Sequence, residues 1–403
     1  MSTAPGPLHG IRILDLGSVV MAPYATQMLG DLGADVVKVE SHAGDSTRQA
    51  GSARNPGMGA VFLTLGRNKR SVALDLKTAQ GRAIVRRLVQ DADVLVHNMR
   101  PDATRRLELD YDAVRAIKPD IVYCAARGFR STGPYRDLPA LDDMIQGMSG
   151  TAAILGQLFG EPAYVPMIYV DKTVGLFVAN GILAALVHRL RTGRGQQVEV
   201  PMFEVMTAFT LVEHLYDATF EPPRAPPGYP RVMSRWRRPF RTADGHLCAL
   251  PYSNAQFERF MAWAGCPEKM QDERFRDIPA RLRNIDTVYA FVAEVLARHA
   301  TADCLRGLQA ADIPCAPVNS LAEVLRDPHL EAVGFLQMQD HPSEGRVRQY
   351  ALPLYFSETP ASLRLPAPRL GEHGREVLGE CGYSAADIDG FIAAGVMRVP
   401  ASP

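Results

Sequence analysis

The chain has 403 residues, enough for one large or two ordinary domains. Hydrophobic residues make up 47% and charged residues 22% of it, which is typical of a globular protein and excludes a disordered chain. The 44 Lys and Arg residues balance the 44 Asp and Glu residues, so no bulk field attracts nucleic acid or an anionic membrane. Any anion site must be local, and the expected partner is a small molecule or another subunit.

Strands and helices alternate over the first 125 residues. Strands are expected at 11–16, 35–40, 71–76, 93–98 and 120–125, and helices at about 23–32 and 79–91. This alternation predicts βαβ units in a mostly parallel, doubly wound α/β sheet. Pro23 suits the first turn of a helix, and Thr78 is placed to cap the second helix.

The second half of the chain is punctuated by Gly and Pro. After a Gly- and Pro-rich segment at 128–150 we expect a helix at about 172–190, a strand at 196–200 and a helix from about 203. The five prolines within 220–230 predict an interdomain linker. A smaller α+β domain follows, with a hairpin over 239–253 that turns at 243–245 and helices at about 254–264, 285–299 and 301–310.

Cysteines, termini and histidines argue against several classes of protein. The six cysteines are scattered without a CxxC pair, as is typical of free thiols in a reducing cytoplasm. The start of the chain shows no export signal. The longest uncharged run, 173–187, is shorter than the ~20 residues of a membrane-spanning helix and predicts a buried helix. The histidines lack metal-ligand spacing, so no metal site is expected.

The first loop argues against a dinucleotide. Glu40 ends the second strand, where a ribose-binding acid would lie. The loop nevertheless has Gly17 alone, and bulky Val19, Val20 and Met21 stand where backbone would approach a pyrophosphate. NAD is therefore not expected, although a Rossmann-like sheet can bind another ligand.

Polar residues follow two expected strands at their carboxyl ends, where open α/β sheets bind ligands. In the run 67–78, three cations precede a strand and Lys77 follows it. A phosphate site and a solvated basic face both fit this pattern, and we favour the face. The run 97–106 supplies Asn98, Arg100 and Arg106 after the next strand, which strengthens the case for an anion site.

Asp171 begins the long apolar helix. An acid there can simply complement the helix dipole, for roughly 0.3–1 kcal/mol. It can also be a covalent nucleophile, if it is partly desolvated and donors meet the developing charge. Both interpretations stay open.

A basic aromatic segment at 234–242 carries four arginines: Arg235, Arg237, Arg238 and Arg241. Their planar guanidinium groups suit a carboxylate or a phosphate. They can equally pair with acids at a subunit boundary, which is the interpretation we favour.

Together these motifs resemble the family III CoA-transferases. The resemblance runs from about residue 7 to the C-terminus through PLHGIRILDL, GDLGADVVKVE, NKRSVALDLKT, RGFRSTGPYRDLPALDDMIQGMSG, DIPCAPVNSLAEVLRDPHL and LGEHGREVL. It implies a large Rossmann-like CoA-binding domain from 1–219 and 331–403, a linker at 220–234, a small α+β domain at 235–330, and an interlocked homodimer.

The resemblance also implies an activity and its residues. CoA would pass from an acyl-CoA donor, such as succinyl-CoA, to a free carboxylic acid through an aspartyl anhydride and an aspartyl-CoA thioester. Asp171 falls on the nucleophile of the family. CoA is then a substrate, and no permanently bound cofactor is expected. The CoA-contacting positions are Val19, Val20, Leu74, Lys77, Asn98, Met99, Arg100, Arg106 and Asp142.

Two departures from the family narrow the expectation. The glycine-rich loop that covers the nucleophile in the formyl-CoA branch has no counterpart in GYPRVMSRWRRPF, so formyl and oxalate are not expected. The related α-methylacyl-CoA racemases pair the aspartate with a histidine near the position of Leu141, which cannot move a proton. A racemase or isomerase and a non-catalytic CoA-binding subunit remain the alternatives.

Overall fold

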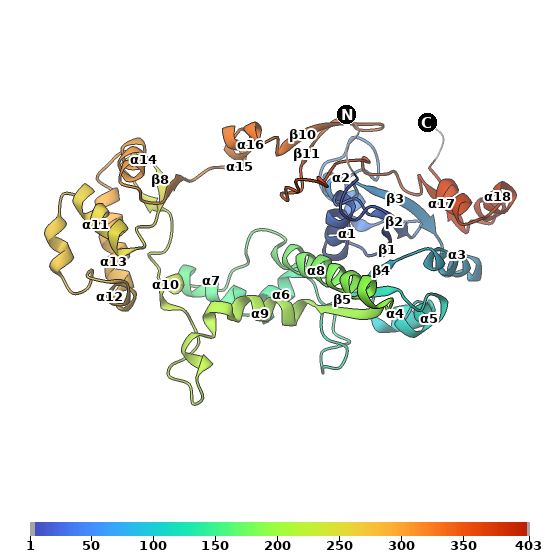
Figure 1. Ribbon diagram of the computed structural model, residues 1–403, viewed down its shortest axis with the longest axis horizontal. Helices are drawn as coiled ribbons and strands as arrows, with labels where there is room; N and C mark the ends of the chain where they lie inside the picture. Colours follow the sequence, from blue (N-terminus) through green and yellow to red (C-terminus); the bar gives the residue numbers. More distant parts are fainter. Residues whose placement is uncertain (1–4, 401–403) are drawn as a thin grey trace. The chain divides into compact units, whose positions relative to one another are not determined.

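The computed structural model describes residues 5–400, which form two compact units (Figure 1). Within this range, unit 1 comprises 5–149, 165–207 and 328–400, and unit 2 comprises 150–164 and 208–327. The chain therefore leaves unit 1 twice and returns to it twice. The Pro-rich segment 220–230, expected as a linker, lies inside unit 2.

A seven-stranded sheet forms the centre of unit 1, in the order β12-β3-β2-β1-β4-β5-β6. Its strands are β1 (Arg12–Leu16), β2 (Asp35–Glu40), β3 (Lys69–Leu74), β4 (Val94–His97), β5 (Val122–Arg127), β6 (Gln196–Pro201) and β12 (Met397–Arg398). All neighbours pair in parallel except β12, which runs antiparallel to β3. The order 3-2-1-4-5-6 is that of Rossmann-type sheets, so the predicted parallel α/β sheet is confirmed.

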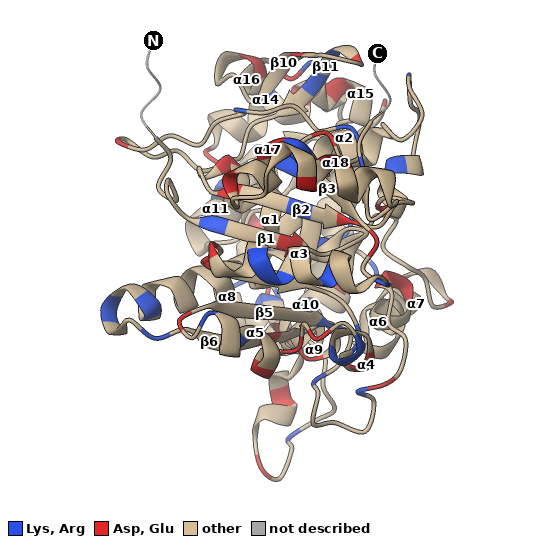
Figure 2. Ribbon diagram, turned by 90° about the vertical axis from the view of Figure 1, so that its right-hand side faces the viewer, with Lys and Arg blue, Asp and Glu red and all other residues tan. Residues whose placement is uncertain are grey.

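Helices cover both faces of this sheet (Figures 1 and 2). Ile13 of β1 packs in one core with α1 and α8, whereas the next residue, Leu14, packs in the other with α3, α17 and α18, as the alternation of side chains along a strand requires. The helical segments of unit 1 are α1 (Met21–Asp31), η1 (Ser46–Gln49), α2 (Ala60–Leu65), α3 (Ala79–Gln90), α4 (Pro101–Arg106), α5 (Tyr111–Ile117), α6 (Asp142–Met148), α8 (Tyr169–Thr192), α16 (Pro328–Ala332), α17 (Gly374–Glu380) and α18 (Ala385–Ala393).

Local sequence signals correctly predict the start of α3 but misplace the ends of β3. The Thr78 hydroxyl accepts a hydrogen bond from the Gly81 N–H at 3.0 Å, which confirms the predicted cap of α3. The strand expected at 71–76 instead spans 69–74 as β3. Lys69 and Arg70 thus lie within the strand, where the buried Asp15 neutralises Lys69 and the partly exposed Asp35 neutralises Arg70.

Helix α8 is only half buried, which corrects the expectation of a buried helix. By length and composition alone, this helix could span a membrane. However, 44% of its most apolar stretch is buried inside the fold, as in the core helix of a globular protein, so length and composition are weak evidence for a membrane span. Val170, Val174, Val178 and Ile182 lie in the core. The exposed side carries large apolar residues, namely Leu176, Phe177, Val187 and Leu190.

Unit 2 has its own core. The predicted hairpin is confirmed: β7 pairs antiparallel with β8 across 241 and 246, and β9 adds a third strand. Ser253 and Gln256 form a capping box that begins α11. The elements are α7 (Thr151–Phe159), most of α9 (Met202–His214), η2 (Tyr216–Thr219), α10 (Pro230–Met233), β7 (Phe240–Arg241), β8 (His246–Ala249), α11 (Asn254–Trp263), η3 (Pro267–Gln271), α12 (Ile278–Arg283), α13 (Ile285–Leu296), α14 (Thr301–Ala310), β9 (Cys315–Pro317) and α15 (Leu321–Val324).

The C-terminal part of the chain completes unit 1. A hairpin of β10 (Leu336–His341) and β11 (Gly345–Tyr350) precedes a long irregular segment that runs beside β3. There the Gly371 N–H donates to the Ser71 hydroxyl at 2.9 Å, and the His373 N–H donates to the Ser71 carbonyl at 3.0 Å. Strand β12 then closes the edge of the sheet.

Candidate functional site

A cavity of about 560 Å³ opens at the carboxyl ends of β1 to β4. This is the end of an open α/β sheet that binds ligands, and the volume is that of a small-molecule site. The cavity is lined by Leu16, Gly17, Ser18, Lys38, Val39, Glu40, Ser41, His42, Ala43, Gly44, Asp45, Leu74, Asp75, Leu76, Lys77, Met99 and Leu107.

The structure brings several of the predicted CoA-contacting residues to this cavity. Leu74, Lys77 and Met99 line it directly. Arg100 follows Met99 as the N-cap of α4, and Arg106 ends that helix beside the lining residue Leu107. Both arginines are exposed next to the cavity without lining it.

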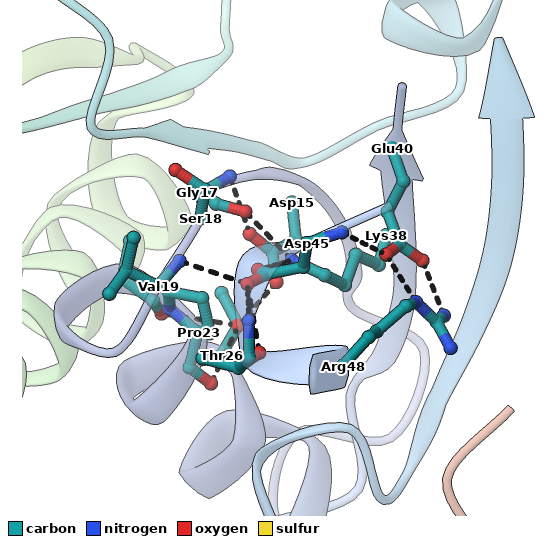
Figure 3. Close-up of polar contacts among 12 residues, drawn as sticks. Asp15, Gly17, Ser18, Val19, Pro23, Thr26, Lys38, Glu40, Asp45 and Arg48 are labelled. Atoms are coloured by element: carbon teal, nitrogen blue, oxygen red, sulfur yellow. Dashed lines mark hydrogen bonds and ion pairs between the residues drawn. The ribbon is translucent and has the colours of Figure 1, made fainter. Parts of the chain in front are cut away.

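Asn98 fixes the first loop, 17–20, rather than pointing freely at a ligand. Its Oδ1 accepts from the Ser18 N–H at 3.0 Å, and its Nδ2 donates to the Ser18 carbonyl at 2.8 Å. The neighbouring amides are also held by side chains, because Gly17 N–H donates to Asp15 at 2.8 Å and Val19 N–H donates to Asp45 at 3.2 Å (Figure 3). Three successive N–H groups of the loop are therefore occupied by protein oxygens.

Val19 is strained. Its φ of 66° lies in the left-handed region, which a β-branched residue rarely adopts and which costs about 1–3 kcal/mol. Two buried charges hold the loop in this shape: Lys38 donates to the Gly17 carbonyl at 2.7 Å and forms an ion pair with Asp45 at 3.0 Å. Burial alone would raise the pKa of Asp45, but Lys38 and the Thr47 N–H outweigh it and lower that pKa.

The three cations at the start of the basic run 67–78 form neither a solvated face nor a phosphate site, and only Lys77 at its end is exposed at the cavity. Arg67, Lys69 and Arg70 are buried and form ion pairs with Asp31, Asp15 and Asp35. Burial lowers the pKa of Lys69 to about 8, against the attraction of Asp15. Our preferred interpretation as a solvated face is therefore wrong, since partners remote in the sequence draw these cations inside.

The Glu40 carboxylate is used in contacts within the protein. It forms an ion pair with Arg48 at 2.7 Å and accepts a hydrogen bond from the Asp45 N–H (Figure 3). It also accepts a hydrogen bond from the Ser71 hydroxyl. These contacts occupy both carboxylate oxygens. Glu40 thus braces the loop 41–45 and has no oxygen left over for a ribose.

Asp171 and Asp142 form a second polar cluster at the start of two helices. Asp171 lies in the first turn of α8, partly buried, and its N–H donates to Asp142 Oδ2 at 3.1 Å. Gln146 holds the other oxygen of Asp142 at 2.6 Å. Burial, and then the negative charge of Asp142, raise the pKa of Asp171 to about 6. The dipole of α8 would lower this pKa, so burial and Asp142 act against the dipole at this position.

Helix α8 carries Asp171 toward the first loop. Gly175, one turn after Asp171 on the same side of the helix, meets the start of α1: a Cβ there would lie 2.9 Å from the Met21 carbonyl oxygen and 3.0 Å from the Tyr24 ring. Val20, another predicted CoA contact, is buried beside this point as the residue preceding α1. Helix α8, which carries Asp171, therefore packs directly against α1, the helix that follows the loop 17–20.

Sequence reasoning missed the loop 41–45, which supplies five of the lining residues. The sequence did contain a signal for this loop. It follows the carboxyl end of β2, which is the end of a parallel strand where ligands bind, and β2 lies between β1 and β3. Leu141 is exposed and precedes α6 without an acidic or basic side chain. In the described part of the chain, no three His, Cys, Asp or Glu side chains gather as a metal site would require.

The fold and the cavity define an α/β protein with a Rossmann-type sheet and a cavity of small-molecule size at the carboxyl ends of its strands. The family model for CoA-transferase family III matches residues 8–374. The chain belongs to this family and is a CoA-transferase.

Individual relatives agree with this assignment. The chain is 35% identical over 386 residues to a succinate–glutarate CoA-transferase from Agrobacterium fabrum, covering 93% of this chain and 95% of the relative. It is 32% identical to the succinyl-CoA:glutarate CoA-transferase of Mus musculus, over 97% of this chain and 90% of the relative. A crystal structure of a CAIB/BAIF family protein from Brucella suis matches with a TM-score of 0.79 and 32% identity, over 94% of this chain and all of that one.

Proposed function

We propose that the enzyme moves CoA from an acyl-CoA donor, such as succinyl-CoA, to a free carboxylic acid, with Asp171 as the covalent carrier. The observation that carries the proposal is the partly buried Asp171 carboxyl with its raised pKa, on a helix packed against the loop of the cavity. The names of the relatives, which act on succinate and glutarate, support a dicarboxylic acid as the acceptor.

The cavity suits CoA as a substrate. Its apolar side chains, including Leu16, Leu74 and Met99, offer a surface for the adenine ring or the pantetheine arm. Lys77 lines the rim, and Arg100 and Arg106 lie beside it, so cations are available for the phosphates. A locally cationic rim is what a chain with no net charge needs to bind a polyanion.

The chemistry balances without a metal or a separate base. The Asp171 carboxylate attacks the donor thioester, which forms a mixed anhydride and releases CoA thiolate. The thiolate attacks the aspartyl carbonyl, which forms an aspartyl-CoA thioester and frees the donor acid. The acceptor carboxylate attacks this thioester and releases the thiolate again, which finally takes the acceptor acyl group and restores the Asp171 carboxylate. Partial burial of Asp171 favours each step because water would hydrolyse the anhydride.

Trapping tests the proposal directly. The enzyme is incubated with succinyl-CoA, quenched with hydroxylamine or borohydride, and the modified peptide is mapped by mass spectrometry. We expect the modification on Asp171. The variant Asp171→Asn, which should fold and bind CoA, would show neither the modification nor turnover. Asp143→Asn, at an exposed position of α6, is the matched control that keeps both. Wild-type turnover by Asp171→Asn, or exchange of the α-proton without any label, would refute the proposal.

We also propose that the enzyme is an interlocked homodimer. The exposed apolar residues on α8, such as Leu176 and Phe177, support a covered surface on this helix. Light scattering at assay concentration should give twice the chain mass, and a monomeric mass would refute this part of the proposal.

A further inference from the structure

Strand β12, the last strand of unit 1, lies behind the wall of the cavity without lining it. Met397 and Arg398 pair with Leu74 and Ala73 of β3. Gly371 packs closely against the same strand, because a Cβ at this position would lie 2.2 Å from the Arg398 carbonyl oxygen. Strand β12 is therefore fixed by two other segments of unit 1, and it can hold the segments that it contacts.

The loop 41–45 of the cavity wall is tied to this end of the chain through His42. The Nε2 atom of His42 lies 3.3 Å from the Val396 carbonyl oxygen, and the Arg398 guanidinium donates to the His42 carbonyl at 3.0 Å. A carbonyl oxygen only accepts, so Nε2 carries the proton of the ring. His42 lines the cavity, whereas Val396 and Arg398 do not. Two hydrogen bonds thus connect a lining residue to residues behind it.

The same Val396 carbonyl holds a second part of the wall, the segment 75–77. It accepts a hydrogen bond from the Asp75 N–H at 2.8 Å. Asp75 Oδ1 in turn accepts from the Lys77 N–H at 3.0 Å. Lys77 is the exposed lysine of the cavity lining. One carbonyl therefore bridges two loops that follow the neighbouring strands β2 and β3, and it fixes the backbone that carries the cation.

These contacts bear on affinity because loops at the edge of a sheet have no ladder of hydrogen bonds of their own. Their shape depends on contacts with neighbouring segments. When a loop spends part of its time in another shape, the apparent affinity for a ligand falls by the fraction that is competent to bind. A single hydrogen bond that favours the competent shape changes the affinity by about two- to tenfold.

We infer that residues 396–398 are a positioning element for CoA, which keep the loop 41–45 and the segment 75–77 in the arrangement that binds it. Val396 and Arg398 act through His42 and Asp75 and are positioning residues. The inference rests on the proposed function, because it takes CoA as the ligand of this cavity.

Hydrogen exchange tests the positioning in the full-length enzyme without ligand. Arg398→Met removes the donor to the His42 carbonyl at an exposed position. We expect faster amide exchange in the peptide that spans 41–45. Arg398→Lys should restore part of the slow exchange, since an ammonium group also donates to a carbonyl. Arg375→Met, at an exposed arginine of α17 that pairs with Asp389, is the matched control and should exchange as the wild type does. Wild-type exchange in Arg398→Met would overturn the inference.

Calorimetry with free CoA and steady-state kinetics test the consequence for the ligand. In Arg398→Met we expect the Kd for CoA and the KM for succinyl-CoA to rise roughly threefold or more. The kcat at saturating succinyl-CoA and the thermal midpoint should stay unchanged. A lower kcat and midpoint at an unchanged Kd would show a purely structural role and overturn the inference. A weaker dependence of the Kd on salt would make Arg398 a direct phosphate contact, which would overturn it as well.

The results for the wild type separate this inference from the proposed function. A wild-type enzyme that binds CoA but is not modified on Asp171 by succinyl-CoA would refute the proposed carrier, while the comparison of Kd and exchange between the wild type and Arg398→Met would still decide the inference. A wild-type enzyme that does not bind CoA would overturn both.

Discussion

At the scale of single residues, the loop of the cavity stores conformational strain. Val19 adopts a left-handed conformation while its N–H is held by Asp45, and Asp45 is held by Lys38. Such outliers persist only where the surrounding structure fixes them, and they gather at binding sites. The buried Lys38–Asp45 pair fixes the loop at two points: Lys38 donates to the Gly17 carbonyl, and Asp45 accepts from the Val19 N–H.

Val19→Gly tests this strain. Glycine adopts the same φ without cost, so we expect a stability gain of about 1 kcal/mol, measured by urea denaturation. The more flexible loop should also raise the KM for succinyl-CoA. Glu108→Gly, at another exposed positive-φ position of unit 1, is the control: its gain should be smaller, and its KM should not change. An unchanged KM in Val19→Gly would show that the loop shape has no role in binding.

The charge of Asp142 is predicted to set the pH range of activity. Asp171 must be ionised to attack, and its pKa of about 6 places a loss of rate as the pH falls through 6. Asp142→Asn removes a charge that raises this pKa, so the acid limb of kcat/KM should move to lower pH, by up to about one unit. Asp143→Asn is the control, with an unchanged profile expected. An acid limb that does not move would separate Asp142 from the titration of Asp171.

At the scale of elements, the packing of α8 on α1 is predicted to set the position of Asp171. Gly175→Ala introduces a methyl group 2.9 Å from the Met21 carbonyl oxygen, a backbone atom that cannot rotate away. We expect a stability loss of about 1–3 kcal/mol and a lower kcat at saturating succinyl-CoA. Gly147→Ala, where a Cβ meets nothing within 4 Å, is the control and should leave both unchanged. A normal kcat in a stably folded Gly175→Ala would show that this contact does not position the aspartate.

Elements were easier to predict from the sequence than contacts between them. The alternation of apolar runs located the strands of the parallel sheet and the helices α1, α3 and α8 between them, because each depends on neighbours within a few positions. The burial of Lys69 was missed because its partner, Asp15, is 54 positions away. The interaction of Asn98 with Ser18, 80 positions away, was equally invisible. Local patterns thus located the strand ends that form the site, while long-range pairing decided which polar residues face the cavity.

At the scale of the whole molecule, zero net charge makes CoA binding depend on a few cations. Lys77→Ala removes the exposed lysine of the cavity lining, whereas the other, Lys38, is paired with Asp45. We expect the Kd for CoA to rise roughly tenfold, with a weaker dependence on salt. Modification of Asp171 at saturating succinyl-CoA should persist. Lys118→Ala, at a residue paired with Asp120 outside the cavity, is the control. Unchanged CoA affinity in Lys77→Ala would remove this residue from the binding site.

The pairing of β12 with β3 has a consequence for how the enzyme matures. Leu74 lines the cavity and lies opposite Met397, so two segments that emerge from the ribosome far apart in time meet at the cavity wall. Until the later segment arrives, β3 is an unprotected edge that can pair with other chains. During synthesis the nascent polypeptide therefore keeps this edge of the sheet unpaired, which makes it a candidate for chaperone protection.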